Sequence, residues 1–142
     1  MRSVLCVMLF ASCLAALGCS GRIPTYPVKG KVVYKDGKAF SGGNGLTIWF
    51  ESTASPYHRA SGEVDEKGEF VLSFIEANSG APEGEHRIRF DPGTTHMQAS
   101  PEIALGKKMP VRYLEFRTSN LKQVIERGAN VFTVEVDPPN SK

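Results

Sequence analysis

The sequence has 142 residues, which lies within the usual range for one domain and is too short for two ordinary ones. Lysine and arginine number 17 and aspartate and glutamate number 15, which gives a formal net charge of +2 at pH 7. This balance excludes the strongly basic surface typical of nucleic-acid binding, so we expect no nucleic-acid partner. Glycine (14) and proline (9) recur between stretches rich in Val, Ile, Phe and Thr, which favours an all-β domain.

The N-terminal segment is typical of a secretory signal peptide. Arg2 supplies a positive charge, and Val4 to Leu17 then runs without a charged residue. This apolar run is shorter than the roughly 20 residues that a helix needs to cross a bilayer. A buried N-terminal helix is the alternative, but the run has no amphipathic stripe. We therefore predict that residues 1–18 form a signal peptide.

The end of that segment, Leu14-Ala15-Ala16-Leu17-Gly18-Cys19, resembles the lipobox of bacterial lipoprotein precursors. The resemblance implies cleavage after Gly18 and attachment of lipid to Cys19, with Ala16 at the position where the motif usually has leucine. Several acyl chains on one residue anchor a protein to a membrane without spanning it. Ser20, rather than aspartate, follows the cysteine, which under the proteobacterial sorting rule permits transfer to the outer membrane.

Cysteine usage agrees with lipidation. Cys6 and Cys13 are removed with the predicted signal peptide, which leaves Cys19 as the single cysteine of the mature chain. A free thiol and an intermolecular disulfide remain alternatives for an exported protein. Neither of them explains why the cysteine directly follows the apolar run. We expect the partner at this end of the chain to be a membrane, contacted through lipid on Cys19.

The mature chain is predicted to begin with a tether, residues 19–26, followed by a folded domain, residues 27–138, and a short tail, residues 139–142. Val28, Gly30, Val32 and Tyr34 alternate with lysines, which predicts a strand with one buried face. Similar alternation predicts further strands around Leu46/Ile48/Phe50, Phe70/Leu72/Phe74, Ile88/Phe90 and Phe132/Val134/Val136. The stretch 91–109 breaks this rhythm and predicts a long loop with one helical turn near Glu102 to Leu105.

Three segments carry a resemblance to a known family. Pro27 to Lys38, Ala60 to Phe70 and Gly80 to Phe90 resemble successive strands and turns of a carboxypeptidase regulatory-like domain of the transthyretin-like type. The closing segments, 110–113, 118–121 and 128–132, are similar to small planctomycete lipoproteins that carry this domain. The resemblance implies a seven-stranded Greek-key β-sandwich. It implies no peptidase activity, because the zinc and catalytic residues of carboxypeptidases belong to a separate domain.

Motifs for catalysis and metal binding are not found in the sequence. His58, His86 and His96 occur singly, without the paired spacing of a zinc site, so no metal and no cofactor is expected. No serine lies in a Gly-x-Ser-x-Gly elbow. For His86, within an alternating strand, we expect a partly buried or cross-strand position.

Trp49 and Tyr57 are the candidate ligand-binding residues. Their rings could offer aromatic surfaces to a sugar or a peptide, and strand alternation predicts that Trp49 points away from the core face of Ile48 and Phe50. Packing beneath a neighbouring loop is the alternative for Trp49. We predict a membrane-anchored, noncatalytic envelope module that binds a protein or glycan or has a structural role. A hydrolase with an active site that assembles only on folding remains the alternative function.

Overall fold

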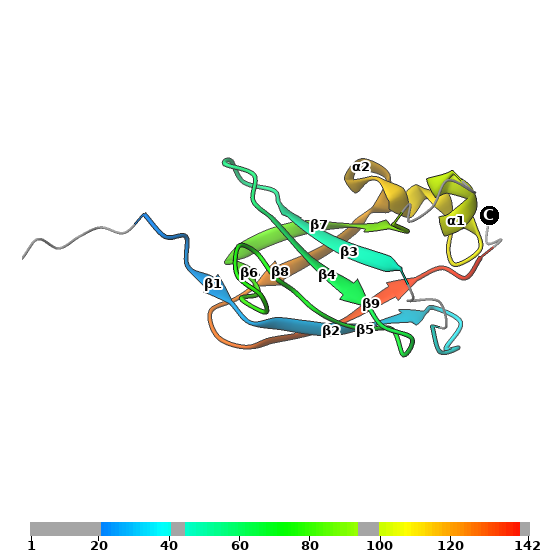
Figure 1. Cartoon of the computed structure of the whole chain (residues 1–142), viewed down its shortest axis with the longest axis horizontal. Coiled ribbons are helices and arrows are strands. Elements are labelled where there is room, and N and C mark those ends of the chain that lie inside the picture. The colour runs from blue at the N-terminus through cyan, green and yellow to red at the C-terminus, as the bar shows by residue number, and fades with distance from the viewer. Residues whose placement is uncertain (1–20, 41–44, 94–99, 140–142) are drawn as a thin grey trace, which may run out of the picture.

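The protein is a β-sandwich in the computed structural model, which describes residues 21–40, 45–93 and 100–139. One sheet has four antiparallel strands in the order β4 (Arg59–Val64), β3 (Leu46–Ser52), β7 (Gly84–Asp91) and β8 (Leu121–Ile125). The other has three strands in the order β5 (Glu69–Val71), β2 (Val28–Tyr34) and β9 (Asn130–Val136). The predicted all-β sandwich, with seven strands in its two larger sheets, is confirmed (Figure 1).

The first and last long strands of the described chain lie side by side. β2 and β9 pair in parallel over seven residues, from Val28 opposite Asn130 to Tyr34 opposite Val136 (Figure 1). Such a pair needs a long connection, and here the connection includes all four strands of the other sheet. At the other edge of this sheet, the three residues of β5 pair with β2 in the antiparallel sense.

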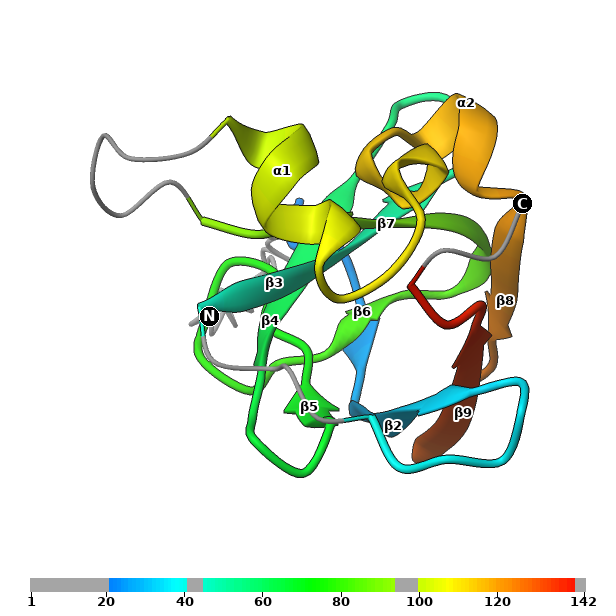
Figure 2. The same ribbon diagram turned by 90° about the vertical axis from the view of Figure 1, so that its right-hand side faces the viewer.

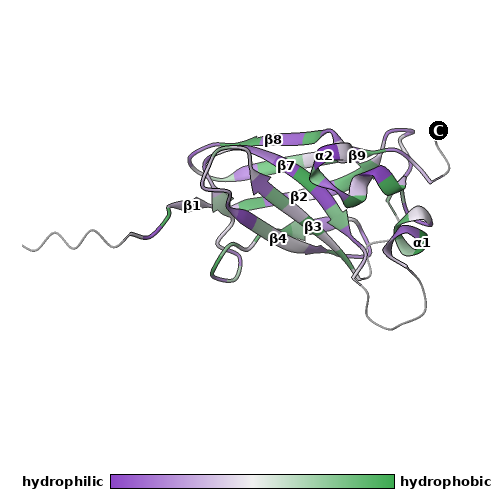
Figure 3. Cartoon of the chain, turned by 90° about the horizontal axis from the view of Figure 1, so that it is seen from above, coloured by the Kyte–Doolittle hydropathy of each residue, from purple (hydrophilic) through white to green (hydrophobic). Residues whose placement is uncertain are grey.

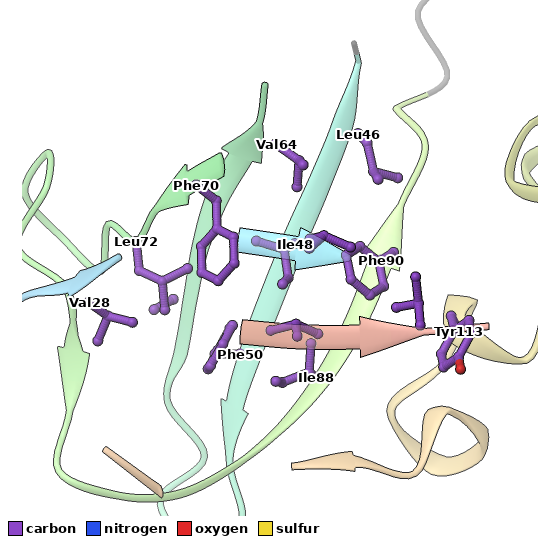
Figure 4. Packing of buried hydrophobic residues seen from close by; sticks show 14 of the residues in the cluster. Val28, Leu46, Ile48, Phe50, Val64, Phe70, Leu72, Ile88, Phe90 and Tyr113 are labelled. Atoms are coloured by element: carbon purple, nitrogen blue, oxygen red, sulfur yellow. The ribbon is translucent and has the colours of Figure 1, made fainter. Parts of the chain in front are cut away.

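The core lies between the inner faces of the two sheets. Polar and apolar residues alternate along the strands (Figure 3), and the apolar ones turn inward, where Ile48, Phe50, Ile88 and Phe90 are at most 1% exposed. The Phe50 ring lies 6.1 Å from the Phe70 ring and thus joins the two sheets across the core (Figure 4). The alternation read from the sequence therefore identifies the buried face of β3 and β7.

One predicted strand is shorter than expected. The alternation of Phe70, Leu72 and Phe74 predicts a single strand, but β5 ends at Val71. Ser73 instead pairs with Ser61 of β4, with both backbone amides donating, at 2.9 and 2.7 Å. The chain thus passes from the three-stranded sheet to the four-stranded sheet at this corner. Phe70 and the later apolar residues Leu72 and Phe74 therefore do not belong to one strand.

The helical segments gather at one end of the sandwich. α1 (Pro101–Gly106) is the helical turn predicted near Glu102 to Leu105, and it begins after the N-cap Ser100. The 3-10 helix η1 (Val111–Leu114) and α2 (Phe116–Ser119) follow, and β8 follows them (Figures 1 and 2). The sequence did not predict η1, α2 or β8, because none of these segments carries a sustained apolar period.

The N-terminal edge also differs from expectation. Thr25 and Tyr26, which lie in the segment predicted as tether, form β1 and pair with β6 (Ala81–Pro82). Gly80 makes this approach possible, because a Cβ there would lie 1.7 Å from the carbonyl oxygen of Tyr26. The folded part of the described chain therefore begins at Thr25.

Candidate functional site

The outer face of the four-stranded sheet carries an ordered array of charged and aromatic side chains. Strand register places Trp49 of β3 opposite Ser61 of β4 on one side and opposite Arg89 of β7 on the other. Glu51 is likewise flanked by Arg59 and Arg87. Successive side chains of a strand alternate between faces, so residues two apart stand in adjacent rows. The sheet therefore gathers these groups without help from a loop.

Glu51 is the buried centre of this array. Its side chain is 7% exposed, and its two carboxylate oxygens accept from Arg59 Nε at 2.6 Å and from Arg87 Nη2 at 2.7 Å. The two arginine side chains are 60% and 35% exposed. Charge-assisted bonds of this length are strong and fix geometry. Glu51 therefore holds Arg59 and Arg87 in place, while both arginine side chains remain partly exposed.

Phe116, the first residue of α2, lies over the arginines. The guanidinium carbons of Arg59, Arg87 and Arg89 lie 5.7, 6.0 and 5.4 Å from the centroid of its ring. The guanidinium carbon of Arg89 also lies 5.5 Å from the centroid of the Trp49 ring, so it contacts two aromatic rings. Distances below about 6 Å are those of attractive cation–π contacts. We call Trp49, Glu51, Arg59, Arg87, Arg89 and Phe116 the arginine–aromatic cluster.

The cluster has more hydrogen-bond donors than acceptors. A guanidinium has five N–H donors, yet the three arginines together make four hydrogen bonds to described residues. Two of these are long, since Arg89 Nη1 lies 3.4 Å from both Asp91 Oδ2 and the Leu114 carbonyl oxygen. Among the described residues, Trp49 Nε1 and Arg87 Nε are buried without an acceptor. Such donors are uncommon because an unmet one is costly.

An open groove of about 1420 Å³ adjoins the cluster at Trp49. Neutral polar residues from several elements contribute to its lining, including Thr47, Ser61, Ser73 and Asn78. It continues around the β4–β5 corner to the outer face of the three-stranded sheet, where Lys29 and Lys31 line it. The groove thus gives an extended ligand a path that begins at the indole of Trp49.

Of the predicted ligand-binding residues, Trp49 lies in this site and Tyr57 does not. Trp49 is half-buried on the outer face of β3 and lines the groove, as the alternation predicts for its direction. Tyr57 is 63% exposed in the segment between β3 and β4 and does not line the groove. Gly18 and Cys19 lie outside the described residues. Ligand binding by either aromatic residue stays a prediction.

Sequence reasoning missed the residues that surround Trp49. Arg87 and Arg89 alternate with Ile88 and Phe90, and this pattern does place both arginines on the outer face of one strand. Their position opposite Glu51 and Trp49 follows from the register of β3 with β7, which no local pattern indicates. Phe116 reaches the cluster through a helix that the sequence did not predict.

The histidines form no site with the cluster. His86 is fully buried on the inner face of β7, where Nδ1 lies 3.0 Å from the Gly84 carbonyl oxygen, and burial lowers its pKa. The His58 ring lies edge-on to Phe74 at 5.7 Å, and His96 lies outside the described residues. Within residues 21–40, 45–93 and 100–139, no group of three His, Cys, Asp or Glu side chains could hold a metal ion.

The helices of the described chain are short. None of them has the length and apolar character needed to cross a membrane.

Comparison with known proteins yields one similar structure. No family model matches the sequence, and no curated protein matches it. A DUF3823 family protein from Parabacteroides merdae resembles the chain with a TM-score of 0.46 and 17% sequence identity. The match covers 82% of this chain and 48% of that protein, so the chain spans about half of its length. The fold assignment therefore rests on the sheets themselves, and the resemblance to a carboxypeptidase regulatory-like domain stays a prediction.

Proposed function

We propose that the protein is an exported bacterial lipoprotein whose β-sandwich is a noncatalytic binding module of the cell envelope. The observation that carries the binding function is the arginine–aromatic cluster, in which Trp49 and three partly exposed arginines stand on a sheet and the arginines make fewer hydrogen bonds than they have donors. Side chains on strands hold a binding geometry better than side chains on loops. The cluster is therefore the ligand-binding surface of the module, and the anchor is the lipid on Cys19.

The lipobox and the position of β1 support the anchor. Five residues separate Cys19 from Thr25, the first residue of β1. The six steps from Cys19 to Thr25 span at most about 22 Å when extended. Lipid on Cys19 therefore keeps the sandwich close to the membrane, and Ser20 favours the outer membrane. A carboxypeptidase regulatory-like domain of the transthyretin-like type is the family that we propose for the sandwich.

Two measurements test the proposal. The intact mass of the membrane-extracted protein should correspond to a chain that begins at Cys19 with added acyl mass, and a Cys19→Ala variant should lack that mass. An unmodified soluble chain would contradict the anchor.

Binding is tested by retention of the full-length protein on immobilised envelope fractions. Retention should be lost in Trp49→Ala and kept in Tyr57→Ala, which removes an exposed aromatic ring outside the cluster. Circular dichroism would check that both variants fold. Equal retention of the two variants would contradict the assigned surface. Turnover of an envelope substrate that disappears on a single substitution in the cluster would favour the alternative hydrolase.

A further inference from the structure

We propose that the arginine–aromatic cluster is an anion-binding subsite, and that its ligand is a polysaccharide with carboxylate-bearing sugars separated by neutral ones. The inference rests on the proposed binding function and names the class of ligand. The polysaccharide lies along the adjoining groove, with one carboxylate on the cluster.

The donor excess is the first step of the argument. Both carboxylate oxygens of Glu51 already accept hydrogen bonds, from Arg59 and from Arg87. The hydrogen bond from Arg89 to Asp91 is long, at 3.4 Å. Nε and Nη2 of Arg89 make no hydrogen bond to another described residue, and its side chain remains 25% exposed. The cluster therefore has fewer acceptors than donors, and the Arg89 side chain keeps part of its surface exposed. A ligand that supplies negatively charged oxygen would complete it.

Preorganisation is the second step. The Arg89 guanidinium contacts two aromatic rings, those of Trp49 and Phe116, which restrict its position, and the partly desolvated setting strengthens its attraction for an anion. A guanidinium fork matches the two oxygens of a carboxylate, which gives paired hydrogen bonds with a defined geometry. Little side-chain entropy is lost on binding, because Arg89 is already held in place.

The groove indicates what carries the carboxylate. The residues next to Trp49 are Thr47 and Ser61, and Ser73 and Asn78 lie farther along. Their hydroxyl and amide groups both donate and accept hydrogen bonds, as sugar hydroxyls do. The charged residues of the lining are two lysines, Lys29 and Lys31, and four acidic residues, Glu63, Asp65, Glu66 and Glu69. Their excess of negative charge opposes an acidic peptide with a charge on every residue. A chain of spaced carboxylates and neutral sugars suits both regions.

The test uses the full-length protein in detergent and three polymers. Hyaluronan oligosaccharides carry a uronate on alternate sugars, carboxyl-reduced hyaluronan keeps the same backbone without charge, and poly-L-glutamate is the acidic peptide. We expect binding of hyaluronan that weakens at high salt and falls about tenfold on carboxyl reduction, the effect of losing about 1.4 kcal/mol. Arg89→Gln should cause a similar loss.

Arg127→Gln is the matched control. Arg127 lies between β8 and β9, its side chain is 78% exposed, and it pairs with Glu83. The same change at this position should leave hyaluronan binding within twofold of the wild type. Equal binding of the reduced polymer would overturn the anion subsite and leave the proposed binding function standing. Stronger binding of poly-L-glutamate would overturn the polysaccharide. Failure of all three polymers, with envelope retention intact, would overturn the ligand class alone.

Discussion

The two sheets of the sandwich have outer faces of different character. On the four-stranded sheet, η1 and α2 pack against β7 and bring Phe116 over the arginines, and on this face Trp49, Arg87 and Arg89 are half-buried and Glu51 is buried. On the three-stranded sheet, Lys29, Lys31 and Val131 are exposed, the last at 68%. Both faces arise from the same alternation of side chains. The difference shows that a cover of nine residues, 111–119, turns an ordinary polar face into a preorganised cluster.

The largest expected effect comes from the same substitution made on the two faces. Glu51→Gln removes the buried charge that holds Arg59 and Arg87, and breaking such a pair in a buried site costs several kcal/mol. Because both arginines are partly exposed, we expect a loss of about 2 kcal/mol in the free energy of unfolding, measured by urea denaturation. Glu69→Gln, on the exposed face of β5, should cost less than about 0.5 kcal/mol. Equal losses would contradict the contrast.

The cover itself is tested by Phe116→Ala. This variant loses three cation–π contacts, each of about 0.5–1 kcal/mol, together with part of its buried ring area, so we expect a loss of about 1.5 kcal/mol. Val131→Ala trims an exposed side chain on the other face and should change stability by less than about 0.5 kcal/mol. Tryptophan fluorescence should also shift in Phe116→Ala, because Arg89 contacts both Phe116 and Trp49. Trp49 is the single tryptophan of the sequence, so the signal reports on this site. An unchanged spectrum and stability would contradict the role of the cover.

The two faces of β7 differ in their response to pH. Burial lowers the pKa of His86 on the inner face, so the unfolded chain, with a histidine pKa near 6.5, binds the proton more readily. Stability should therefore fall as the pH drops through about 6.5, by at most about 0.7 kcal/mol between pH 7 and pH 6. Urea midpoints measured across that range should show the fall in the wild type and in His58→Gln. A fall that persists undiminished in His86→Leu would refute the assignment.

The smallest effect is expected on the exposed face of β2. Lys31→Gln changes a solvated side chain beside Glu69 and Thr133, so its stability should stay within about 0.5 kcal/mol of the wild type. Thermal unfolding should show almost the same midpoint. A clear loss of thermal stability would indicate that Lys31 takes part in packing or in ion pairs on this face.

Apolar alternation in the sequence predicts β2, β3, β7 and β9 but does not predict β4 or β8. β2, β3, β7 and β9 each carry a clear apolar face, and all four were expected from that pattern. β8 has the sequence Leu-Lys-Gln-Val-Ile, in which exposed Val124 stands beside buried Ile125, so its alternation is weak. Its pairing with β7 is a tertiary contact that local sequence does not encode.

The candidate site could be predicted only in part for a related reason. The direction of Trp49 follows from its place between Ile48 and Phe50. The arginine–aromatic cluster instead depends on the register of β7 against β3, and on a helix of four residues that carries Phe116 across the sheet. Register comes from long-range pairing, and so short a helix owes its stability to packing rather than to propensity. Neither is visible in one sequence.

The parallel pairing of β2 with β9 bears on how the chain acquires its structure. Ribosomes make the chain from its N-terminus, so β2 exists well before residues 130–136 and has until then a partner strand of three residues. Contacts so distant in sequence close slowly, because a large loop must be ordered first. The sandwich therefore stays incomplete until β9 has emerged, and its two sheets are completed only after nearly all of the described chain has been made.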